Sequence, residues 1–146
     1  MSTFKQKLTG LLRPFDLPVK TRTFMENEGL LFAAEKVRIT VVYHRLRSKG
    51  RNIRYKRETV WGSLAISNKR LVGYAFKKRI IHLPFDQEKA HSVNFSCVNG
   101  KVLVMAFDPA VFNPESSGSM EFRYHFDGAL EAYGIIRDLI HRDAPR

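Results

Sequence analysis

The chain has 146 residues, 44% of them hydrophobic, which fits one globular domain with a core and excludes a wholly disordered chain. Its formal net charge of +11 favours a polyanionic partner, which leaves nucleic acid, an anionic membrane surface and an acidic protein as the candidate classes. The single Cys97 excludes an intrachain disulfide, and the sequence shows neither a transmembrane run nor a secretory signal, so we expect a cytoplasmic protein.

The first residues predict a short basic amphipathic helix over 3–13, with these apolar residues at helical spacing: Phe4, Leu8, Leu11 and Leu12. Pro14 and Pro18 end this helix, because proline lacks the backbone donor and clashes with a continuing turn. We expect the helix to pack on the domain, and the alternative is a helix that binds a membrane interface or a partner. Residues 1–27 are therefore interpreted as a basic helix and linker, and residues 28–146 as the main domain.

Two long strands joined by a tight turn follow. Residues 35–47 alternate and are rich in β-branched side chains, so they predict a strand with one face made by Val37, Ile39, Val41 and Tyr43. The turn falls at residues 48–52, where Gly50 and Asn52 tolerate the dihedral angles of a tight loop. Residues 53–67 return as the second strand, with a bend at Gly62. Two shorter strands follow over residues 70–77 and 80–85.

Residues 93–107 give the clearest local signal, a hairpin around Asn99-Gly100. This pair is the preferred one for a two-residue turn in which both residues have positive φ. Pairing outward from the turn places three apolar pairs on one face, which we expect to be core: Cys97 with Val102, Phe95 with Val104, and Val93 with Ala106. Cys97 is then a small core residue.

The last part of the chain predicts a loop, a strand and a helix. Residues 108–119 are rich in Pro, Ser and Gly and are the best candidate for a mobile segment. Residues 120–126 predict a seventh strand, in which Phe122, Tyr124 and Phe126 alternate. Asp127 then caps a helix over 128–142, whose apolar stripe is made by Leu130, Tyr133, Ile136 and Ile140. The whole pattern predicts a mainly β fold of seven strands followed by one helix.

The stretch from Trp61 to Asp86 resembles the GRAM and bacterial PH-like branch of the pleckstrin-homology superfamily. It matches the pattern G-x-L-x-[IV]-[ST]-N-x-R-L through Gly62, Leu64, Ile66, Ser67, Asn68, Arg70 and Leu71, and the next strand ends in Ile81-His82-Leu83-Pro84. The resemblance covers roughly residues 28–142 and implies a PH-like, seven-stranded antiparallel β-barrel or roll capped by the C-terminal helix. The final helix lacks the tryptophan of typical PH domains, which favours the GRAM-like branch. In the turn after the motif strand, we expect Asn68 to bond to its own backbone two residues on.

The strongest functional signal is a run of cations. From Lys36 to Arg57 the sequence has nine Lys or Arg and no Asp or Glu. In PH domains that bind inositol phosphates, a basic pattern lies on the first two strands and their loop, and the resemblance implies that Lys49, Arg54 and Lys56 hold comparable places, with Lys56 where arginine is usual. Arg47 and Arg51 lie in or beside the exposed turn, so the predicted anion-binding residues are Arg47, Lys49, Arg51, Arg54 and Lys56. Arg54 and Lys56 are two residues apart in a strand, so we expect them to converge on one anion. The alternative is an edge hairpin that its charges protect from pairing, but mixed signs would serve that purpose with less repulsion.

A second cationic block, at neighbouring turns, consists of Lys69, Arg70, Lys77, Lys78 and Arg79. Whether it shares a surface with the first block depends on the three-dimensional arrangement.

Three functions compete for the basic hairpin. It can contact an anionic membrane surface or a phosphoinositide-type headgroup, or bind nucleic acid with help from the interleaved Tyr43, Tyr55 and Trp61. It can also belong to a protein-binding adaptor that uses the sheet edge or the groove beside the last helix, as many PH-like domains do. The histidines are scattered and no zinc or phosphate-binding motif occurs. We therefore predict a non-catalytic module without metal or cofactor, whose partner is anionic lipid headgroups or an acidic protein, with nucleic acid as the further alternative.

Overall fold

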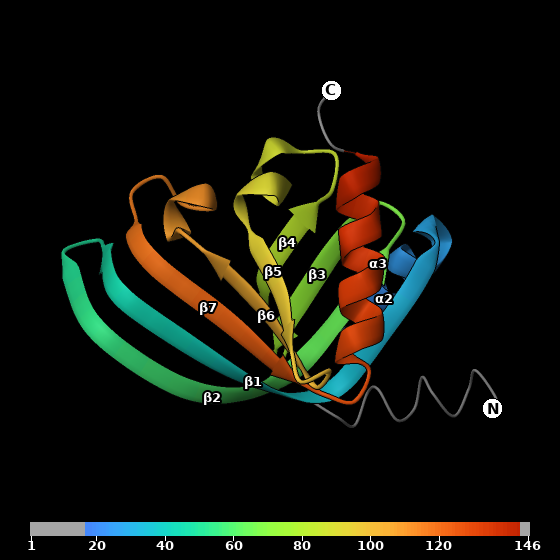
Figure 1. The fold of residues 1–146 in the computed structure, drawn as a ribbon, viewed down its shortest axis with the longest axis horizontal. Helices are drawn as coiled ribbons and strands as arrows, with labels where there is room; N and C mark the ends of the chain where they lie inside the picture. The colour runs from blue at the N-terminus through green and yellow to red at the C-terminus, as the bar shows by residue number, and fades with distance from the viewer. Residues whose placement is uncertain (1–16, 144–146) are drawn as a thin grey trace.

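The computed structural model describes residues 17–143, in which a curved sheet is combined with two helices (Figure 1). The helix predicted over residues 3–13 lies outside this part of the chain. The elements are α2 (Val19–Glu28), β1 (Leu30–Ser48), β2 (Arg51–Ser67), β3 (Arg70–Ala75), β4 (Lys78–Pro84), β5 (Asn94–Val98), β6 (Val102–Phe107), β7 (Ser117–His125) and α3 (Ala129–Arg142). Two short 3-10 turns, Glu88–Ser92 and Pro109–Val111, complete the order.

Within the described residues, seven strands form one antiparallel sheet in the order β4-β3-β2-β1-β7-β6-β5. The central strand β1 is 19 residues long and pairs with β2 on one side and with β7 on the other. Its register against β2 shifts between Ala34 and Val37, where Lys36 has a φ of 58°. Such bulges bend a strand and increase its twist. The predicted fold class, mainly β with seven antiparallel strands and a final helix, is confirmed.

The core lies on the inner face of the curved sheet, where alternate strand residues point. Val37, Ile39 and Val41 of β1 are buried there, as predicted, and Tyr43 packs against the same cluster. From β7 the cluster takes the predicted Phe122 and Tyr124, and Phe126, directly after this strand, packs against it. Helix α3 covers this face over β5 and β6 (Figure 1).

The buried face of α3 matches the predicted stripe in part, since Ile136 is buried and Tyr133 and Ile140 pack against the core. Leu130 is 62% exposed, and the fully covered residues are Ala129, Ala132, Ile136 and Leu139. Two of these are alanines, which let the helix approach the sheet more closely than large side chains would. Asp127 is not the cap either, because the N-cap is Gly128 and no side chain accepts a capping hydrogen bond.

The β5–β6 hairpin is one residue out of the predicted register. Asn99 and Gly100 have φ of 53° and 69°, as predicted, but the pairing sets Val98 opposite Val102. Lys101 therefore belongs to the turn, and its N–H donates to the carbonyl of Val98 at 3.0 Å. A one-residue slip exchanges the two faces of a strand. The prediction for β5 holds, with Val93, Phe95 and Cys97 against the core, but β6 contributes Leu103, Met105 and Phe107 instead of Val102, Val104 and Ala106.

Ser67, and not Asn68, holds the turn between β2 and β3. The Oγ of Ser67 accepts hydrogen bonds from the N–H groups of Lys69 at 3.1 Å and Arg70 at 3.2 Å. The backbone of Asn68 bonds to other segments: its N–H donates to the carbonyl of Gly29 at 3.0 Å, and its carbonyl accepts from Nη2 of Arg142 at 2.7 Å.

Helix α2 lies on the outer side of the sheet and was not predicted. It begins directly after Pro18, which is its N-cap residue, so this proline starts a helix instead of ending one. Met25 is fully buried and forms a second, smaller apolar cluster with Leu17, Ala65, Val72 and Tyr74. Much of the predicted linker is thus helical and packed on the domain.

Candidate anion-binding hairpin

The outer parts of β1 and β2 extend beyond the strands that flank them, β7 and β3, and form a long ribbon. We call this ribbon, residues 43–57, the basic hairpin. It projects at the left of Figure 1. β3 pairs with β2 only from Gly62 to Ile66. On the other side, β7 pairs with β1 as far as Arg47, and the hydroxyl of Ser116 donates to that of Ser48 at 2.8 Å. The hairpin is therefore supported along β1 and open along β2.

A two-residue turn at Lys49 and Gly50 forms the tip. Their φ values are 46° and 77°, and the flanking residues Ser48 and Arg51 are paired. A turn with two positive φ angles matches the right-handed twist of the ribbon. The prediction that Asn52 belongs to the turn is wrong, since Asn52 lies in β2 opposite Arg47. The turn places Lys49 at the end of the ribbon.

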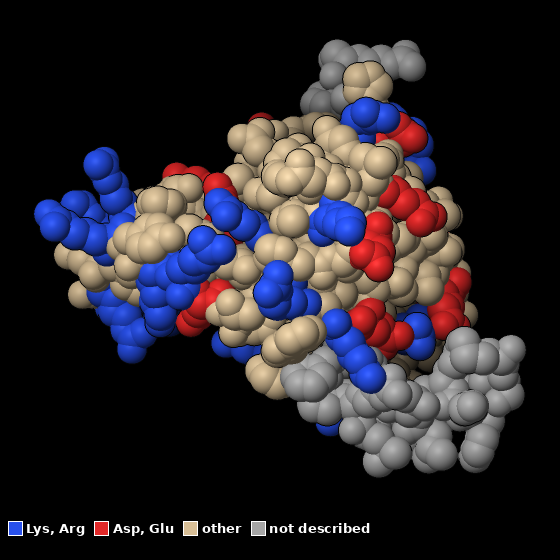
Figure 2. All heavy atoms as spheres, turned by 60° about the horizontal axis from the view of Figure 1, so that its bottom comes forward, with Lys and Arg blue, Asp and Glu red and all other residues tan. Residues whose placement is uncertain are grey.

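All five residues predicted to bind an anion are exposed: Arg47, Lys49, Arg51, Arg54 and Lys56. Figure 2 shows the blue side chains gathered on the projecting hairpin, whereas blue and red side chains are interspersed over the rest of the visible face. The acid-free run from Lys36 to Arg57 thus becomes a cationic projection in space.

Carboxylates from other segments do not neutralise this projection. Among the described residues, the ion pair within 4.0 Å that involves a predicted site residue joins Nζ of Lys56 to Oε2 of Glu58 at 3.6 Å. Glu58 also accepts a hydrogen bond from the hydroxyl of Tyr43 at 2.9 Å. Burial, and then this hydrogen bond and the charge of Glu58, raise the pKa of Tyr43 to about 12. In the described part of the chain, no carboxylate pairs with the other four cations, which are Arg47, Lys49, Arg51 and Arg54.

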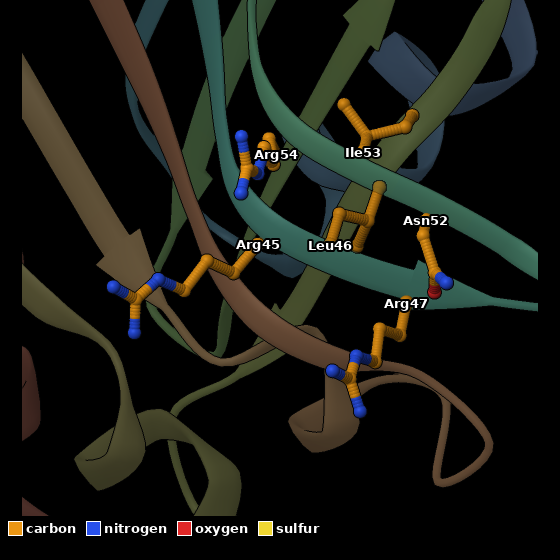
Figure 3. Close-up of a pocket in the computed structure, with 6 residues that line it drawn as sticks. All are labelled: Arg45, Leu46, Arg47, Asn52, Ile53 and Arg54. Atoms are coloured by element: carbon orange, nitrogen blue, oxygen red, sulfur yellow. The ribbon is translucent and has the colours of Figure 1, made fainter.

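The first of two grooves on the hairpin has a volume of about 680 Å³, and we call it the arginine groove. It is lined by Arg45, Leu46, Arg47, Asn52, Ile53 and Arg54. Arg45 and Arg47 point the same way from β1, toward the side on which β7 lies, and their guanidinium groups end apart from each other (Figure 3). Three guanidinium groups around one hollow suit an anion with several oxygens, because each guanidinium offers paired N–H donors.

The second groove, of about 460 Å³, contains the remaining predicted residues, and we call it the lysine groove. It is lined by Tyr43, Leu46, Ser48, Lys49, Arg51, Ile53 and Lys56. The structure thus brings Arg47 and Arg54 together, and separately Lys49, Arg51 and Lys56. Arg54 and Lys56 border different grooves, so they do not converge as strand alternation predicted.

On β1, the conformation of Arg45 changes which side chains share a groove. Arg45 has a φ of 49°, and the register of β1 against β7 shifts between His44 and Arg47. A left-handed residue breaks the alternation of side chains along a strand, so Tyr43 and Leu46 line the same groove. The sequence shows Arg45 as one more cation of the run but carries no signal for its backbone conformation.

Both grooves share an apolar floor. Leu46 and Ile53 are opposite each other in the ribbon and half-buried. Cations around a partly exposed aliphatic pair form an amphipathic surface, in which charges can meet phosphate oxygens while the aliphatic groups contact less polar atoms.

No residue of the second cationic block lines either groove of the hairpin. Lys69 and Arg70 lie at the end of β2 opposite to Arg51, and Arg70 is already paired with Glu28 at 2.8 Å. Lys77 and Arg79 lie at the β3–β4 turn, where the N–H of Phe76 donates to the carbonyl of Trp61.

In the described residues, no group of three or more His, Cys, Asp or Glu is placed to hold a metal ion, and no helix among them is long and apolar enough to cross a membrane. No family model matches this chain, and no curated protein matches its sequence. The function is therefore argued from the chemistry of the hairpin.

Proposed function

We propose that this protein is a non-catalytic, PH-like binding module that contacts an anionic, phosphate-bearing membrane surface through the basic hairpin. The observation that carries the proposal is the lack of internal counter-charge: within the described residues, four of the five predicted cations have no carboxylate partner. Like charges held together without acids repel one another, so an external anion lowers the free energy of this arrangement. A location at the periphery of a membrane follows from the same proposal.

The shape of the hairpin favours a surface over a small enclosed ligand. The two grooves are open, they share the apolar pair Leu46 and Ile53, and they flank a tip that carries Lys49. Each basic residue near an anionic leaflet contributes about 1 kcal/mol to binding. Five such residues on one projection are enough for reversible attachment. The seven antiparallel strands and the final helix agree with the arrangement that the PH-like resemblance implies, which supports this class of module.

The test is sedimentation with vesicles of phosphatidylcholine, alone or mixed with phosphatidylserine, at low and at moderate ionic strength. We expect binding that requires the anionic lipid and weakens with added salt. The double variant Arg51→Glu/Arg54→Glu changes one cation in each groove. Since two cations contribute roughly 2 kcal/mol, its vesicle partition coefficient should fall by at least about thirtyfold.

A matched control separates the hairpin from net charge. The variant Lys20→Glu/Lys101→Glu makes the same charge change at two exposed lysines outside the hairpin. It should keep most of the vesicle binding. Equal loss in both variants would reduce the effect to overall charge, and equal pelleting with neutral and anionic vesicles would remove the proposal. Binding to DNA or RNA in a gel shift, with no vesicle binding, would assign the hairpin to nucleic acid instead.

A further inference from the structure

The outer edge of β2 is open along the basic hairpin. β3 covers β2 only from Gly62 to Ile66, and no other described strand pairs with β2 on that side. The register of β2 against β1 runs without a shift from Gly62, opposite Val37, to Tyr55, opposite His44. From Tyr55 to Val60, β2 is therefore a regular strand with no described strand on its outer side.

One hydrogen bond fixes which backbone groups face outward. The N–H of Phe76 donates to the carbonyl of Trp61 at 2.9 Å, so the carbonyl of Trp61 points away from β1. In an antiparallel strand the backbone groups of successive residues point to opposite sides. Tyr55, Arg57 and Thr59 therefore present their N–H and C=O groups to the open side, while the residues between them bond to β1.

The charges beside this edge specify what can occupy it. Arg54, Lys56 and Arg57 are exposed along it, and Glu58 is the first acid after Lys36 and is already engaged by Tyr43 and Lys56. A second copy of this chain added edge to edge would place cations beside cations, which is the usual way in which proteins prevent such pairing. A strand that carries carboxylates would meet complementary charge instead.

We propose that the edge of β2 from Tyr55 to Thr59 binds an extended acidic peptide segment of a partner protein as an additional antiparallel or parallel strand. The backbone groups of Tyr55, Arg57 and Thr59 supply the hydrogen bonds, and the neighbouring cations select acidic side chains. This inference goes beyond the membrane contact: its hydrogen bonds come from the backbone of Tyr55, Arg57 and Thr59, which line neither groove, and it shares only the charges of Arg54 and Lys56 with the membrane site.

Amide hydrogen exchange, followed residue by residue by NMR, tests the proposal directly. The probe is a synthetic peptide with capped ends in which glutamate and valine alternate, and its control replaces glutamate with lysine. With the acidic peptide, exchange at the N–H groups of Tyr55, Arg57 and Thr59 should slow by about tenfold or more at saturation. The N–H groups of Lys56 and Glu58, already bonded to β1, should change little. This alternation distinguishes strand addition from binding in a groove.

A substitution at Thr59 removes one outward donor without touching the ladder to β1. Proline is tolerated on an edge strand where its N–H would face solvent, so Thr59→Pro should fold and bind the acidic peptide about tenfold more weakly, since a hydrogen bond is lost and the ring obstructs the added strand. Thr59→Ala keeps the N–H and should bind normally. Vesicle sedimentation should be unchanged in both variants, so a failure of strand addition and a failure of the membrane proposal are separable.

Several results would overturn the inference. The acidic peptide could leave exchange at all three outward N–H groups unchanged, slow exchange without alternation, or bind no better than the lysine peptide. If Thr59→Pro proves unfolded by circular dichroism, the exchange pattern of the unmodified protein decides alone.

Discussion

At the scale of single residues, the most tightly organised polar group is a buried cluster around Glu28. Its carboxylate accepts from Nε and Nη2 of Arg70 at 3.1 and 2.8 Å and from the hydroxyl of Ser67 at 2.6 Å, and its side chain is 8% exposed. The cluster ties the end of α2 to the β2–β3 turn. Phe24 of the same helix lies 5.0 Å from the guanidinium carbon of Arg70 and covers the pair. Sequence reasoning assigned Ser67 and Arg70 to a motif but could not supply their partner, because Glu28 is distant along the chain.

We predict that Glu28→Gln destabilises the fold by about 1–3 kcal/mol at neutral pH, because the half-buried Arg70 loses its charged acceptor. Burial alone raises the pKa of Glu28, but the hydrogen bonds from Arg70 and Ser67 and the charges of Arg70 and Lys69 outweigh it, so the pKa lies below its usual 4.5. The carboxylate therefore contributes stability above the unfolded pKa, and this contribution is lost as the pH falls through the folded pKa. Urea denaturation across this range should show the two proteins converging in acid.

Glu26→Gln is the matched control for this prediction. Glu26 lies on the same helix, its side chain is 57% exposed, and its nearest partner, Arg22, is 3.8 Å away. Exposed pairs of this kind contribute about 0.5 kcal/mol or less. A loss as large as that of Glu28→Gln would show that helix α2, and not the buried cluster, is the sensitive feature.

His82 extends the same cluster, and its contribution to stability is also lost in acid, but at a higher pH than that of Glu28. Its Nε2 lies 3.1 Å from Nη1 of Arg70, which requires a neutral ring that accepts the hydrogen bond. Burial, followed by the charges of Arg79, Arg70 and Lys89, lowers the pKa of His82 from its usual 6.5, against the opposing charge of Glu28. The unfolded chain then binds a proton before the folded protein does, so stability falls as the pH drops below 6.5.

We predict that His82→Gln, which keeps an acceptor for Arg70, flattens this part of the stability curve. The measurement is the free energy of unfolding in urea from neutral to mildly acidic pH. His125, whose pKa is also lowered by burial and then by Arg38, Arg123 and Arg57, leaves a residual slope of the same sign. An unchanged slope in His82→Gln would contradict the prediction.

At the scale of elements, two glycines in open space should respond oppositely to the same change. Nothing lies within 4 Å of a Cβ added at Gly50 or at Gly134, so packing does not enter. Gly50 has a φ of 77° in the hairpin turn, and we predict that Gly50→Ala destabilises by about 1 kcal/mol. Gly134 lies within α3, and Gly134→Ala should stabilise by about 0.5–1 kcal/mol.

Thermal unfolding of the two alanine variants checks this pair, and each serves as the control for the other. Because the side chain added is identical, opposite signs can come only from backbone conformation. Destabilisation of both would mean that the added methyl group is not accommodated in α3.

The elements also show how far the sequence determines the fold. Alternation in β1 and β7 correctly predicts their core faces, because a strand buried on one face has a period of two whatever its neighbours are. The β5–β6 register and the buried face of α3 depend on single-residue choices, Lys101 in the turn and alanine against the sheet, that several apolar patterns allow. Sequence reasoning did not predict helix α2, because only Met25 is buried among its residues, VKTRTFMENE. In the site, the sequence shows the five cations. It carries no signal for their division between two grooves, which accompanies the left-handed backbone of Arg45.

At the scale of the whole molecule, the excess of positive charge connects the proposed function to stability. The chain has a net charge of +11. Its positive charge is most concentrated on the basic hairpin, where few carboxylates lie nearby. Folding brings these charges closer than they are in the extended chain, so their repulsion opposes it. Salt with a screening length of about 10 Å at 0.1 M should relieve this repulsion. We therefore expect the unmodified protein to become more stable as sodium chloride is added from low ionic strength.

The same reasoning gives Arg51→Glu/Arg54→Glu a double effect. Reversing two charges inside the cationic cluster replaces repulsion with attraction, so the variant should be more stable than the unmodified protein by about 0.5–1 kcal/mol at low salt, while its binding to anionic vesicles is lost. The difference in stability should shrink as salt is added, whereas a packing effect would persist. Lys20→Glu/Lys101→Glu should gain less, because its charges lie outside the hairpin. If the hairpin variant is instead less stable at low salt, its arginines are held by attractive contacts within the fold, and an external anion is no longer required to explain them.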